Sequence, residues 1–489
     1  MPLDKSVKSA SAKVRERLDH PVLDGDGHTI EYDPIFLEYL HQVAGPDMVK
    51  RYERLGTKGG QYYGTTYEDR FDKRMARIPY WGTPTKNTLD RATAMAPNLL
   101  RARMDEIGID FSILHTSALH LNRFPDEEIR RAGCRALNTM RADMFRGHGD
   151  RMTPSAAIPM HTPDEAIAEL EYAVKVLGLK TIMVAGVVRR PVPIVAREAP
   201  QLARYTQWID NLSVGSPYNY DPFWAKCVEL KVAPMTHTSG IWGSRGDTRN
   251  FVFNHLGHFA ASGEAFCRGL FMGGVTRRFP TLRFGFMEGG VNWACGLYND
   301  LFEHWEKRNY MSLRENLDPA QIDRKALADL MGEYGGEVFA KHVAHIREHG
   351  ILGIPEEDPE NLDDFAACKI RGKQDIHDLF VPPFHFGCEA DDRMNHGAFD
   401  TKVNRLGARL KATFSSDIGH WDVQDMSEVL AEAHESVEHG LMTDEDFRDM
   451  TFTNIVSLVG TLNPDFFRGT VVESAVAKLD PKKLVSAAQ

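Results

Sequence analysis

The sequence lacks the features that mark several large classes of protein. No apolar run approaches the roughly 20 residues needed to cross a bilayer, and residues 1–20 have no apolar centre of the kind found in secretory signals. Its six cysteines are scattered and include no CxxC pair, which indicates reduced and mostly buried thiols. Internal repeats, low-complexity tracts and a glycine-rich phosphate loop are also missing. We therefore expect a cytoplasmic globular protein without a membrane segment.

Positive charge is in deficit as well. The 58 lysines and arginines are outnumbered by 69 aspartates and glutamates, which gives a formal net charge of -11. This balance argues against nucleic acid or an anionic membrane as a partner and leaves a small-molecule substrate as the expected one. The 489 residues are otherwise ordinary in composition, with 42% hydrophobic and 26% charged residues, and are long enough to bury a large core.

What the chain does contain is a regular series of short apolar runs separated by segments with helical spacing. The runs are residues 21–28, 109–117, 152–160, 179–185, 230–240, 282–290, 382–392 and 411–417. Residues 135–149 and 163–178 have apolar positions three and four apart, and Thr162 precedes the second of these as a helix cap. Eight strands alternating with helices predict an α/β fold, most simply a (β/α)8 TIM barrel with helical insertions.

Two segments are longer than a minimal barrel needs. We assign residues 21–470 to the barrel, with insertions at about 30–100 and 305–381, an N-terminal extension at 1–20 and a C-terminal tail at 471–489. Insertions of this length are usually lids or oligomer contacts, so we expect 305–381 to cover the barrel mouth or to form the interface of a homo-oligomer, a dimer in the simplest case. A helix is predicted at 333–350, and its three histidines fit either a solvated face or a metal role.

The first apolar run ends on an unusual set of residues, Asp26-Gly27-His28. Alternate residues of a strand share a face, so the carboxylate of Asp26 and the imidazole of His28 should point the same way. A carboxylate and an imidazole side by side suit a divalent metal, and the glycine between them leaves room. A polar turn after the strand explains the same tripeptide without a metal.

Other runs end in the same manner. His237 ends the fifth run, Glu288 the sixth and Asp417 the eighth. In a barrel the carboxyl ends of all strands open on one face, where active sites are built, so these side chains should meet Asp26 and His28 at one mouth. Two histidines with three carboxylates suit Zn, Mn or Fe, whereas a soft all-sulfur site would require cysteines.

Five stretches of the chain resemble a known family. They are DGDGHTIE (24–31), RARMDEIGIDFSIL (101–114), DPFWAKCVELKVAPMTHTSG (221–240), GGVTRRFPTLRFGFMEGGVNW (273–293) and FSSDIGHWD (414–422). Over most of residues 21–300 and 382–425 the chain is similar to the amidohydrolase superfamily, in the amidohydrolase 2 branch that holds aminocarboxymuconate-semialdehyde decarboxylase and resorcylate-type decarboxylases. The resemblance implies a metal-dependent TIM-barrel enzyme.

The resemblance also implies roles for individual residues. Asp26 and His28 stand where the family has its strand-one metal pair, and His237 matches the histidine ligand of strand five. Asp417 matches the strand-eight aspartate, which binds metal and handles the proton of the attacking water. Glu288 departs from the family, which has a functional histidine there; we expect it to be a metal ligand with a catalytic role.

Two histidines, His255 and His258, lie three residues apart on a predicted helix after the fifth strand. They are either ordinary helix histidines at the barrel rim or the source of another ligand, for which we name His258. In the second case the centre would hold two ions instead of one.

Three functions are compatible with this sequence. The first is a metal-dependent hydrolase, or a decarboxylating or C–C cleaving enzyme, for a small cyclic or aromatic-derived substrate. The second is a non-heme iron oxygenase, with one or two irons, on the same fold. The third is an inactive metal-binding protein. His115, Trp293 and His420 follow predicted strands on the catalytic side and are the expected substrate contacts.

Overall fold

Eight parallel strands form the centre of the structure, a computed structural model that describes residues 7–55, 64–79, 86–118, 120–350 and 359–480. Around the sheet they are β1 (Leu23–Thr29), β2 (Phe111–Thr116), β3 (Met152–Ile158), β4 (Thr181–Val184), β7 (Pro234–Thr236), β8 (Phe284–Phe286), β9 (Phe384–Glu389) and β10 (Lys411–Ser415). Every neighbouring pair is parallel. Each strand coincides with one of the eight predicted runs, in the predicted order, and β1 extends one residue beyond its run, to Thr29.

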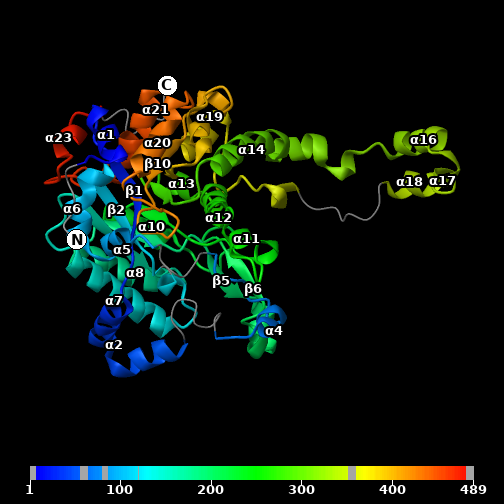
Figure 1. Cartoon of the computed structure of the whole chain (residues 1–489). Coiled ribbons are helices and arrows are strands. Elements are labelled where there is room, and N and C mark those ends of the chain that lie inside the picture. Colours follow the sequence, from blue (N-terminus) through cyan, green and yellow to red (C-terminus); the bar gives the residue numbers. More distant parts are fainter. Residues whose placement is uncertain (1–6, 56–63, 80–85, 119, 351–358, 481–489) are drawn as a thin grey trace. The chain divides into compact units, whose positions relative to one another are not determined.

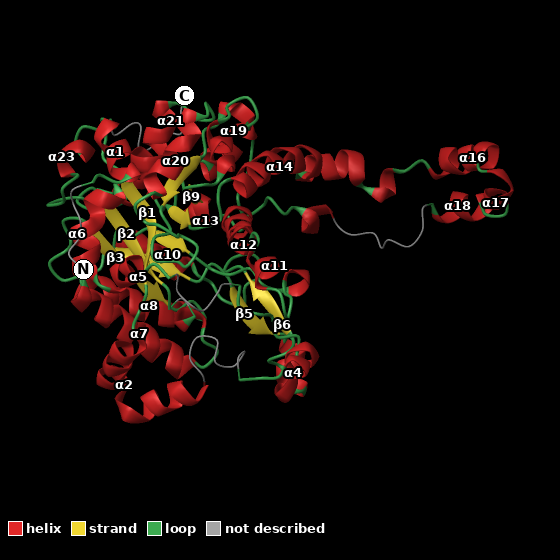
Figure 2. Ribbon diagram, viewed as in Figure 1, coloured by secondary structure: helices red, strands yellow, loops and turns green. Residues whose placement is uncertain are grey.

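The sheet closes where the last strand returns to the first. The backbone N–H of Asp417 donates to the carbonyl of Asp26 at 3.0 Å, and that of His28 donates to the carbonyl of Ile418 at 2.7 Å. Helices surround the strands, which are yellow in Figure 2. The predicted (β/α)8 TIM barrel is therefore confirmed, because the strand order, the parallel pairing and the closure are those of a barrel.

The helices occupy the segments between the strands (Figure 1). Those of the first half are α1 (Ala10–Arg17), α2 (Asp33–Leu55), α4 (Tyr67–Asp72), α5 (Thr88–Met95), α6 (Pro97–Ile107), α7 (Glu127–Met144), α8 (Pro163–Glu171), α9 (Pro193–Glu198) and α10 (Asp221–Glu229). Those of the second half are α11 (Phe251–His255), α12 (His258–Met272), α13 (Val275–Arg278), α14 (Asn292–Arg308), α19 (Lys373–Phe380), α20 (Val429–Glu438), α21 (Asp444–Arg448), α22 (Asn454–Gly460) and α23 (Glu473–Val476). None of the described helices is long and apolar enough to cross a membrane.

Local sequence signals explain several helix ends. Thr162 caps α8 as predicted, in a capping box with Glu165, and residues Tyr172–Val176 continue α8 as a π-helical turn.

A small antiparallel pair, β5 (Val188–Pro191) with β6 (Gln207–Asp210), follows β4 and was not foreseen. Its strands have only four residues each and no long apolar run to reveal them.

The chain divides into two compact units, of which the second is Asn299–Ile376. It contains α15 (Tyr310–Ser312), α16 (Arg324–Tyr334), α17 (Gly336–Ala340) and α18 (Val343–His349). The single helix predicted over 333–350 is wrong, because Gly336 takes a φ of 63° and the segment breaks into two short helices. Parts of both predicted insertions (56–63, 80–85 and 351–358), and of the terminal segments (1–6 and 481–489), lie outside the described residues.

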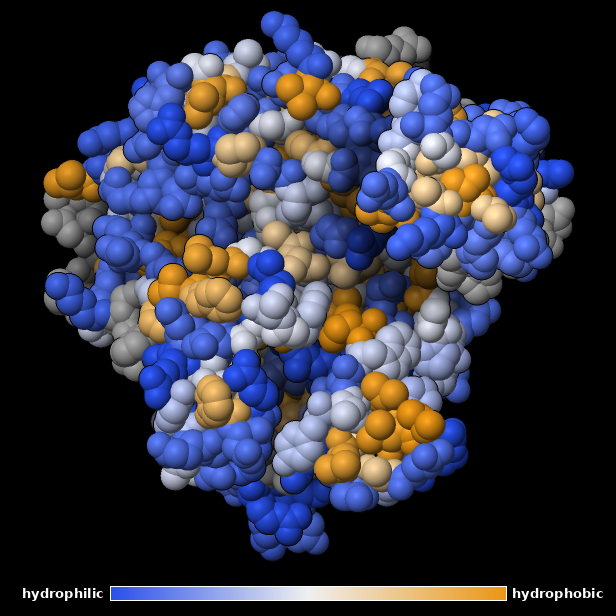
Figure 3. Space-filling view, turned by 90° about the vertical axis from the view of Figure 1, so that its right-hand side faces the viewer, coloured by the Kyte–Doolittle hydropathy of each residue, from blue (hydrophilic) through white to orange (hydrophobic). Residues whose placement is uncertain are grey.

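The core of the barrel unit is rich in phenylalanine, and Phe286 stacks on Phe386 with ring centroids 5.6 Å apart. On the molecular face shown in Figure 3, hydrophobic residues are interspersed among hydrophilic ones.

One charged residue in the interior is Lys411, at the start of β10, whose ammonium donates to Ser457 at 2.7 Å. Burial, together with the nearby Arg283, lowers the pKa of Lys411 to about 7.

This buried lysine makes a prediction for stability. The pKa of Lys411 in the folded protein, about 7, lies below the roughly 10.4 of an unfolded lysine, so the unfolded chain binds more protons between these values. The free energy of unfolding should therefore rise with pH across this window, by up to about 1.4 kcal/mol per pH unit from this group. We expect Lys411→Met to flatten that slope when denaturant unfolding of both proteins is compared from pH 7 to 10. Parallel curves for the two proteins would contradict this assignment.

Candidate metal centre

Metal-ligand side chains from four strand ends converge in the barrel mouth. They form two overlapping groups, in each of which one ligand atom per residue lies within 4.8 Å of the others. The groups are Asp26, His28, His237 and Glu288, and His28, Glu288, Asp417 and His420. All are buried except His420, which is partly exposed. The structure thus brings together the five residues predicted from the strand ends and adds His420 to them.

The end of β1 explains how Asp26 and His28 reach the same place. His28 Nε2 lies 3.3 Å from Asp26 Oδ1, as expected for alternate residues on one face of a strand. A Cβ atom at Gly27 would lie 2.6 Å from Asp24 Oδ2 and 3.0 Å from Leu114. A larger residue here would therefore displace the Asp24 carboxylate from its hydrogen bonds with two serines.

Glu288 and Asp417 both occupy a strained backbone conformation. Their φ angles are 54° and 50°, in the left-handed region that residues other than glycine seldom adopt. Each follows the end of a strand, β8 and β10, where the chain turns away from the sheet. Such strain concentrates at functional sites, because the surrounding structure must hold it in place.

A second aspartate, Asp24, holds this region together and was not identified from the sequence. Its carboxylate accepts hydrogen bonds from the Ser112 hydroxyl at 2.7 Å and from the Ser416 hydroxyl and N–H at 2.8 and 2.9 Å. It thereby ties β1 to β2 and to the residue that precedes Asp417. The D-x-D-x-H spacing was the sequence signal available for it. The register of β1 shifts between Asp24 and Gly27, and Asp24 binds serines and is not in the donor groups.

Distances within the centre are short. His237 Nε2 lies 2.6 Å from Glu288 Oε2, His28 Nε2 lies 3.2 Å from Asp417 Oδ1, and His420 Nδ1 lies 2.7 Å from the same oxygen. The ring of His420 stacks on that of His28 with centroids 3.8 Å apart. His420 is therefore placed against both His28 and Asp417.

The protonation behaviour of these side chains indicates a place for a positive charge. Burial lowers the pKa of His28, but contacts with Asp26 and Asp417 outweigh it and raise that pKa to about 10. Burial, reinforced by Asp417, raises the pKa of Glu288 well above its usual range. Burial lowers the pKa of His237 well below its usual range, which keeps this imidazole neutral. The carboxylates thus draw a proton to the centre unless another cation is present.

The donor atoms fit a divalent metal. Both oxygens of Asp26, both ring nitrogens of His28 and His237, Glu288 Oε2 and Asp417 Oδ1 have no hydrogen-bond partner among the described residues. Buried polar atoms without partners are costly, and a cation that accepts their lone pairs removes the cost. Two or three imidazoles with three carboxylates form a borderline-to-hard donor set, which suits Mn, Zn or Fe.

The structure buries one predicted substrate contact fully and another in part. His115 is fully buried, and its Nε2 lies 3.1 Å from the carbonyl oxygen of Gly25. Burial lowers the pKa of His115 to about 4. Trp293 is half-buried and packs against Phe286 and Phe386, at ring-centroid distances of 5.7 and 5.3 Å.

The expected ligand His258 is outside both groups of donor atoms in the described part of the chain. It lies at the start of α12, and its ring centroid is 3.8 Å from that of Phe259. The ring centroid of Phe259 is in turn 4.3 Å from that of His237. The ring of Phe259 therefore packs against both histidines. His255 likewise lies beside Asp422, at 4.0 Å, and not in the centre.

Sequence reasoning also missed Glu389, the last residue of β9. Burial, together with repulsion by Asp417, raises the pKa of Glu389 to about 9, so it carries a proton at neutral pH. It is outside both donor groups. Glu389 is the last residue of an apolar strand, and Glu288 lies two residues beyond the end of another. An acid at the end of an apolar strand was therefore the sequence signal for Glu389.

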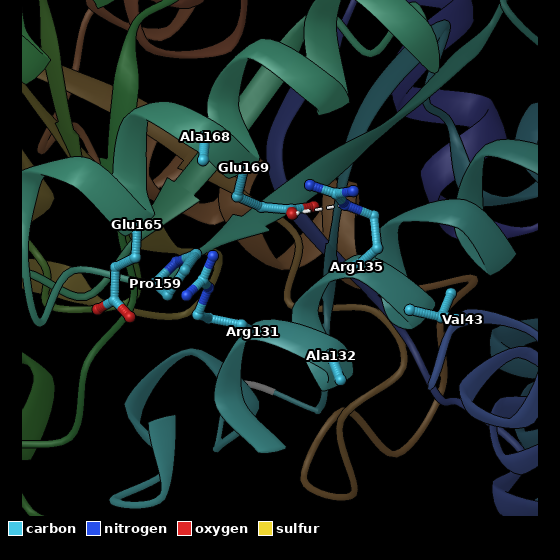
Figure 4. Close-up of a pocket in the computed structure, with 8 residues that line it drawn as sticks. All are labelled: Val43, Arg131, Ala132, Arg135, Pro159, Glu165, Ala168 and Glu169. Atoms are coloured by element: carbon cyan, nitrogen blue, oxygen red, sulfur yellow. Dashed lines mark hydrogen bonds and ion pairs between the residues drawn. The ribbon is translucent and has the colours of Figure 1, made fainter. Parts of the chain in front are cut away.

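A separate cavity of about 180 Å³ lies between α2, α7 and α8 (Figure 4). Its charged residues are paired: Glu169 accepts from Arg135 at 2.8 Å, as the dashed line shows, and Glu165 accepts from Arg130 at 2.9 Å. Arg131 pairs with Glu127 at 3.2 Å. Because these charged groups already have partners of opposite charge, we infer no catalytic or binding role for the cavity.

Comparison with known proteins agrees with the fold. Residues 92–337, half of the chain, match the model of the amidohydrolase family. A solved amidohydrolase from Mycobacterium avium subsp. paratuberculosis K-10 superposes with a TM-score of 0.52 at 16% identity, over 91% of this chain and 100% of that chain.

Two decarboxylases also match. A dihydroxybenzoic acid decarboxylase from Polaromonas sp. JS666, solved with manganese and 2-nitroresorcinol, gives a TM-score of 0.47 at 18% identity, over 92% of this chain and 99% of that chain. A 5-carboxyvanillate decarboxylase from Sphingomonas paucimobilis gives 0.45 at 12% identity, over 90% and 98%. Sequence identities this low show a shared fold and nothing more. The assignment of the chain to a family therefore rests on the match to the family model. The chain belongs to the amidohydrolase family.

Proposed function

We propose that this protein is a metal-dependent hydrolase that cleaves a small, uncharged carboxylic-acid derivative such as an amide, ester or lactone. The observation that carries the proposal is the convergence of Asp26, His28, His237, Glu288 and Asp417, with unpartnered donor atoms, in the barrel mouth. Asp26, His28, His237 and Glu288 would hold one divalent ion. Asp417 belongs to the overlapping donor group and lies beside His28 and Glu288. Bound there, such an ion polarises a carbonyl oxygen and lowers the pKa of a bound water toward about 7.

The side chains around this position are suited to move a proton. Interactions with His420 and His28 lower the pKa of Asp417 to about 2, against its burial, so Asp417 is ionised at neutral pH and has a free lone pair. His420 Nδ1 lies 2.7 Å from Asp417 Oδ1, and the His420 side chain is exposed enough to meet the substrate. Asp417 is thus the general base, and His420 orients it.

Charge favours hydrolysis over decarboxylation. Asp26, Glu288 and Asp417 carry three negative charges when ionised, so one divalent cation leaves the centre with an excess negative charge when the histidines are neutral. A carboxylate substrate would add another negative charge in a buried place, where repulsion is strong. A neutral acyl group has no such penalty. The decarboxylases among the structural neighbours nevertheless make release of CO2 the second candidate.

Product analysis tests the proposal. The purified protein is loaded with Zn, Mn or Fe and incubated with neutral amides, esters and lactones, and with hydroxybenzoic acids, in ¹⁸O-water. We expect a free acid that carries ¹⁸O. Release of CO2 from the acids would establish the decarboxylase instead, and consumption of O2 by the iron form would establish the oxygenase.

Metal content provides a prediction that needs no substrate. We expect about one equivalent of metal in the wild type, and we expect His237→Ala to weaken metal binding by at least about 100-fold, because a neutral imidazole ligand is lost. His258→Ala is the matched control, since His258 is outside both donor groups, and it should retain the metal. Elemental analysis after dialysis against a weak chelator measures both. Metal loss in the control with retention in His237→Ala would reverse the assignment.

A further inference from the structure

The second unit contains a helical hairpin, residues 324–349, made of α16, α17 and α18 (Figure 1). Its first and last helices run antiparallel. The Arg324 guanidinium donates to the carbonyl of Glu348 at 3.1 Å, and Arg347 pairs with Asp329 at 2.6 Å. This pairing of the start of α16 with the end of α18 defines the hairpin.

The hairpin has almost no core of its own. Its helices have 11, 5 and 7 residues, and Ala328 is their one buried residue. Isolated helices this short are unstable in water, and tertiary packing normally provides the missing free energy. Three short helices with one buried alanine do not provide it. The hairpin therefore needs another surface to pack against.

One set of side chains offers such a surface. Leu330, Tyr334, Val338 and Phe339, which we call the hairpin face, are 51%, 74%, 78% and 42% exposed. Leu330 and Tyr334 are four residues apart and share a side of α16, and the other two follow directly in α17. Scattered exposed apolar residues are normal, but four large ones within ten positions are typical of an interaction site.

Charge identifies the kind of partner. The hairpin carries four basic and four acidic residues, namely Arg324, Lys325, Lys341 and Arg347, and Asp329, Glu333, Glu337 and Glu348. It is neutral, whereas the whole chain has a net charge of -11. A strongly charged partner would be matched by a patch of opposite sign, which this segment lacks. A second copy of the acidic chain is repelled least at a neutral segment.

The size of the hairpin face is also compatible with self-association. Four large side chains exposed to this degree present on the order of 500 Å² of apolar surface, so two copies would bury roughly 1,000 Å², the lower limit for a specific interface. Tyrosine at the centre of such a patch is a common energetic anchor. A two-fold axis makes one patch self-complementary, because each copy contributes the same residues.

We propose that the hairpin is a homodimerisation element, in which the hairpin face packs on the same face of a second copy. This interaction is independent of the catalytic proposal. It accounts for an insertion that the barrel does not need.

The oligomeric state of the full-length, metal-loaded protein tests the proposal. Sedimentation equilibrium should show a dimer of the 55.1 kDa chain. The double variant Tyr334→Glu/Val338→Glu should weaken its association by at least about 100-fold, since four acidic side chains would meet in the interface. The control Val176→Glu/Val403→Glu introduces the same charges at positions of the barrel unit that are 67% and 65% exposed, and it should leave the dimer intact. A monomeric wild type, or a double variant that stays dimeric, would overturn the proposal.

Cross-linking provides an independent measurement. All six native cysteines are buried, so Val338→Cys introduces an accessible thiol into a background of protected ones. A short bis-maleimide should link this variant into dimers at micromolar concentration, and it should not link Val403→Cys. Equal cross-linking of the two variants would show that the contact is random. If the hairpin face packs on the barrel of its own chain, the wild type will be monomeric and neither cysteine will cross-link.

Discussion

Replacing Asp417 with asparagine is expected to lower turnover by about 10²–10⁴-fold, which is the range for loss of a general base. Asparagine has the same shape, but its amide accepts no proton at neutral pH. In the native protein, contacts with His420 and His28 keep Asp417 ionised despite its burial. The rate of product formation by the metal-loaded variant measures the effect, and elemental analysis shows whether the metal is retained.

The matched control is Asp422→Asn, which removes an acid five residues further along the same loop. Asp422 is 38% exposed at its side chain, lies 4.0 Å from His255 and is outside both donor groups. We expect its turnover to stay within a few-fold of the wild type. If Asp417→Asn kept full turnover with full metal content, Asp417 would not be the base.

Glu288→Gln is expected to have opposite effects on the metal-free and the metal-loaded protein. Without metal, the Glu288 carboxyl is buried beside Asp417, and these surroundings raise its pKa well above the usual range. A carboxyl whose pKa rises on folding costs stability at neutral pH, because the unfolded chain ionises it freely. Glutamine has no such cost, so the metal-free variant should melt at a higher temperature than the wild type.

With metal the order should reverse. The variant has lost a ligand that lies 2.6 Å from His237 Nε2, and we expect its metal affinity to fall at least about 10-fold. Its gain in melting temperature on adding metal should shrink accordingly, because stabilisation by a ligand follows its affinity. Melting curves with and without Mn or Zn, and a titration of metal, measure both effects.

Glu389→Gln is the control for Glu288→Gln. Burial raises the pKa of Glu389 to about 9, but this residue is outside both donor groups. Its replacement should also stabilise the metal-free protein above pH 5 while leaving metal affinity unchanged. A Glu288→Gln protein that binds metal as tightly as the wild type would exclude Glu288 from the centre.

The barrel and most of the candidate centre could be predicted from the sequence. Strands buried on both faces are short continuous apolar runs, so eight such runs with helices between them identify the fold. A ligand placed directly at a strand end has its position set by that strand, as with His28, His237 and Asp417. For these residues the distance along the chain to the nearest strand is at most two positions, which leaves little freedom.

Where longer segments intervene, only the tertiary structure decided the outcome. His258 lies beyond a loop and a short helix, and its ring packs on Phe259 and not in the centre. His420 was expected at the substrate, and a turn that includes Gly419, with a φ of 97°, brings its ring onto His28. A Cβ atom at Gly419 would lie 2.4 Å from the carbonyl oxygen of His28. The turn after the last strand therefore depends on a close contact with the first strand. Periodicity reports which face of a strand or helix a residue occupies, but the path of a loop is set by contacts between residues far apart in the chain, and these form only in the folded structure.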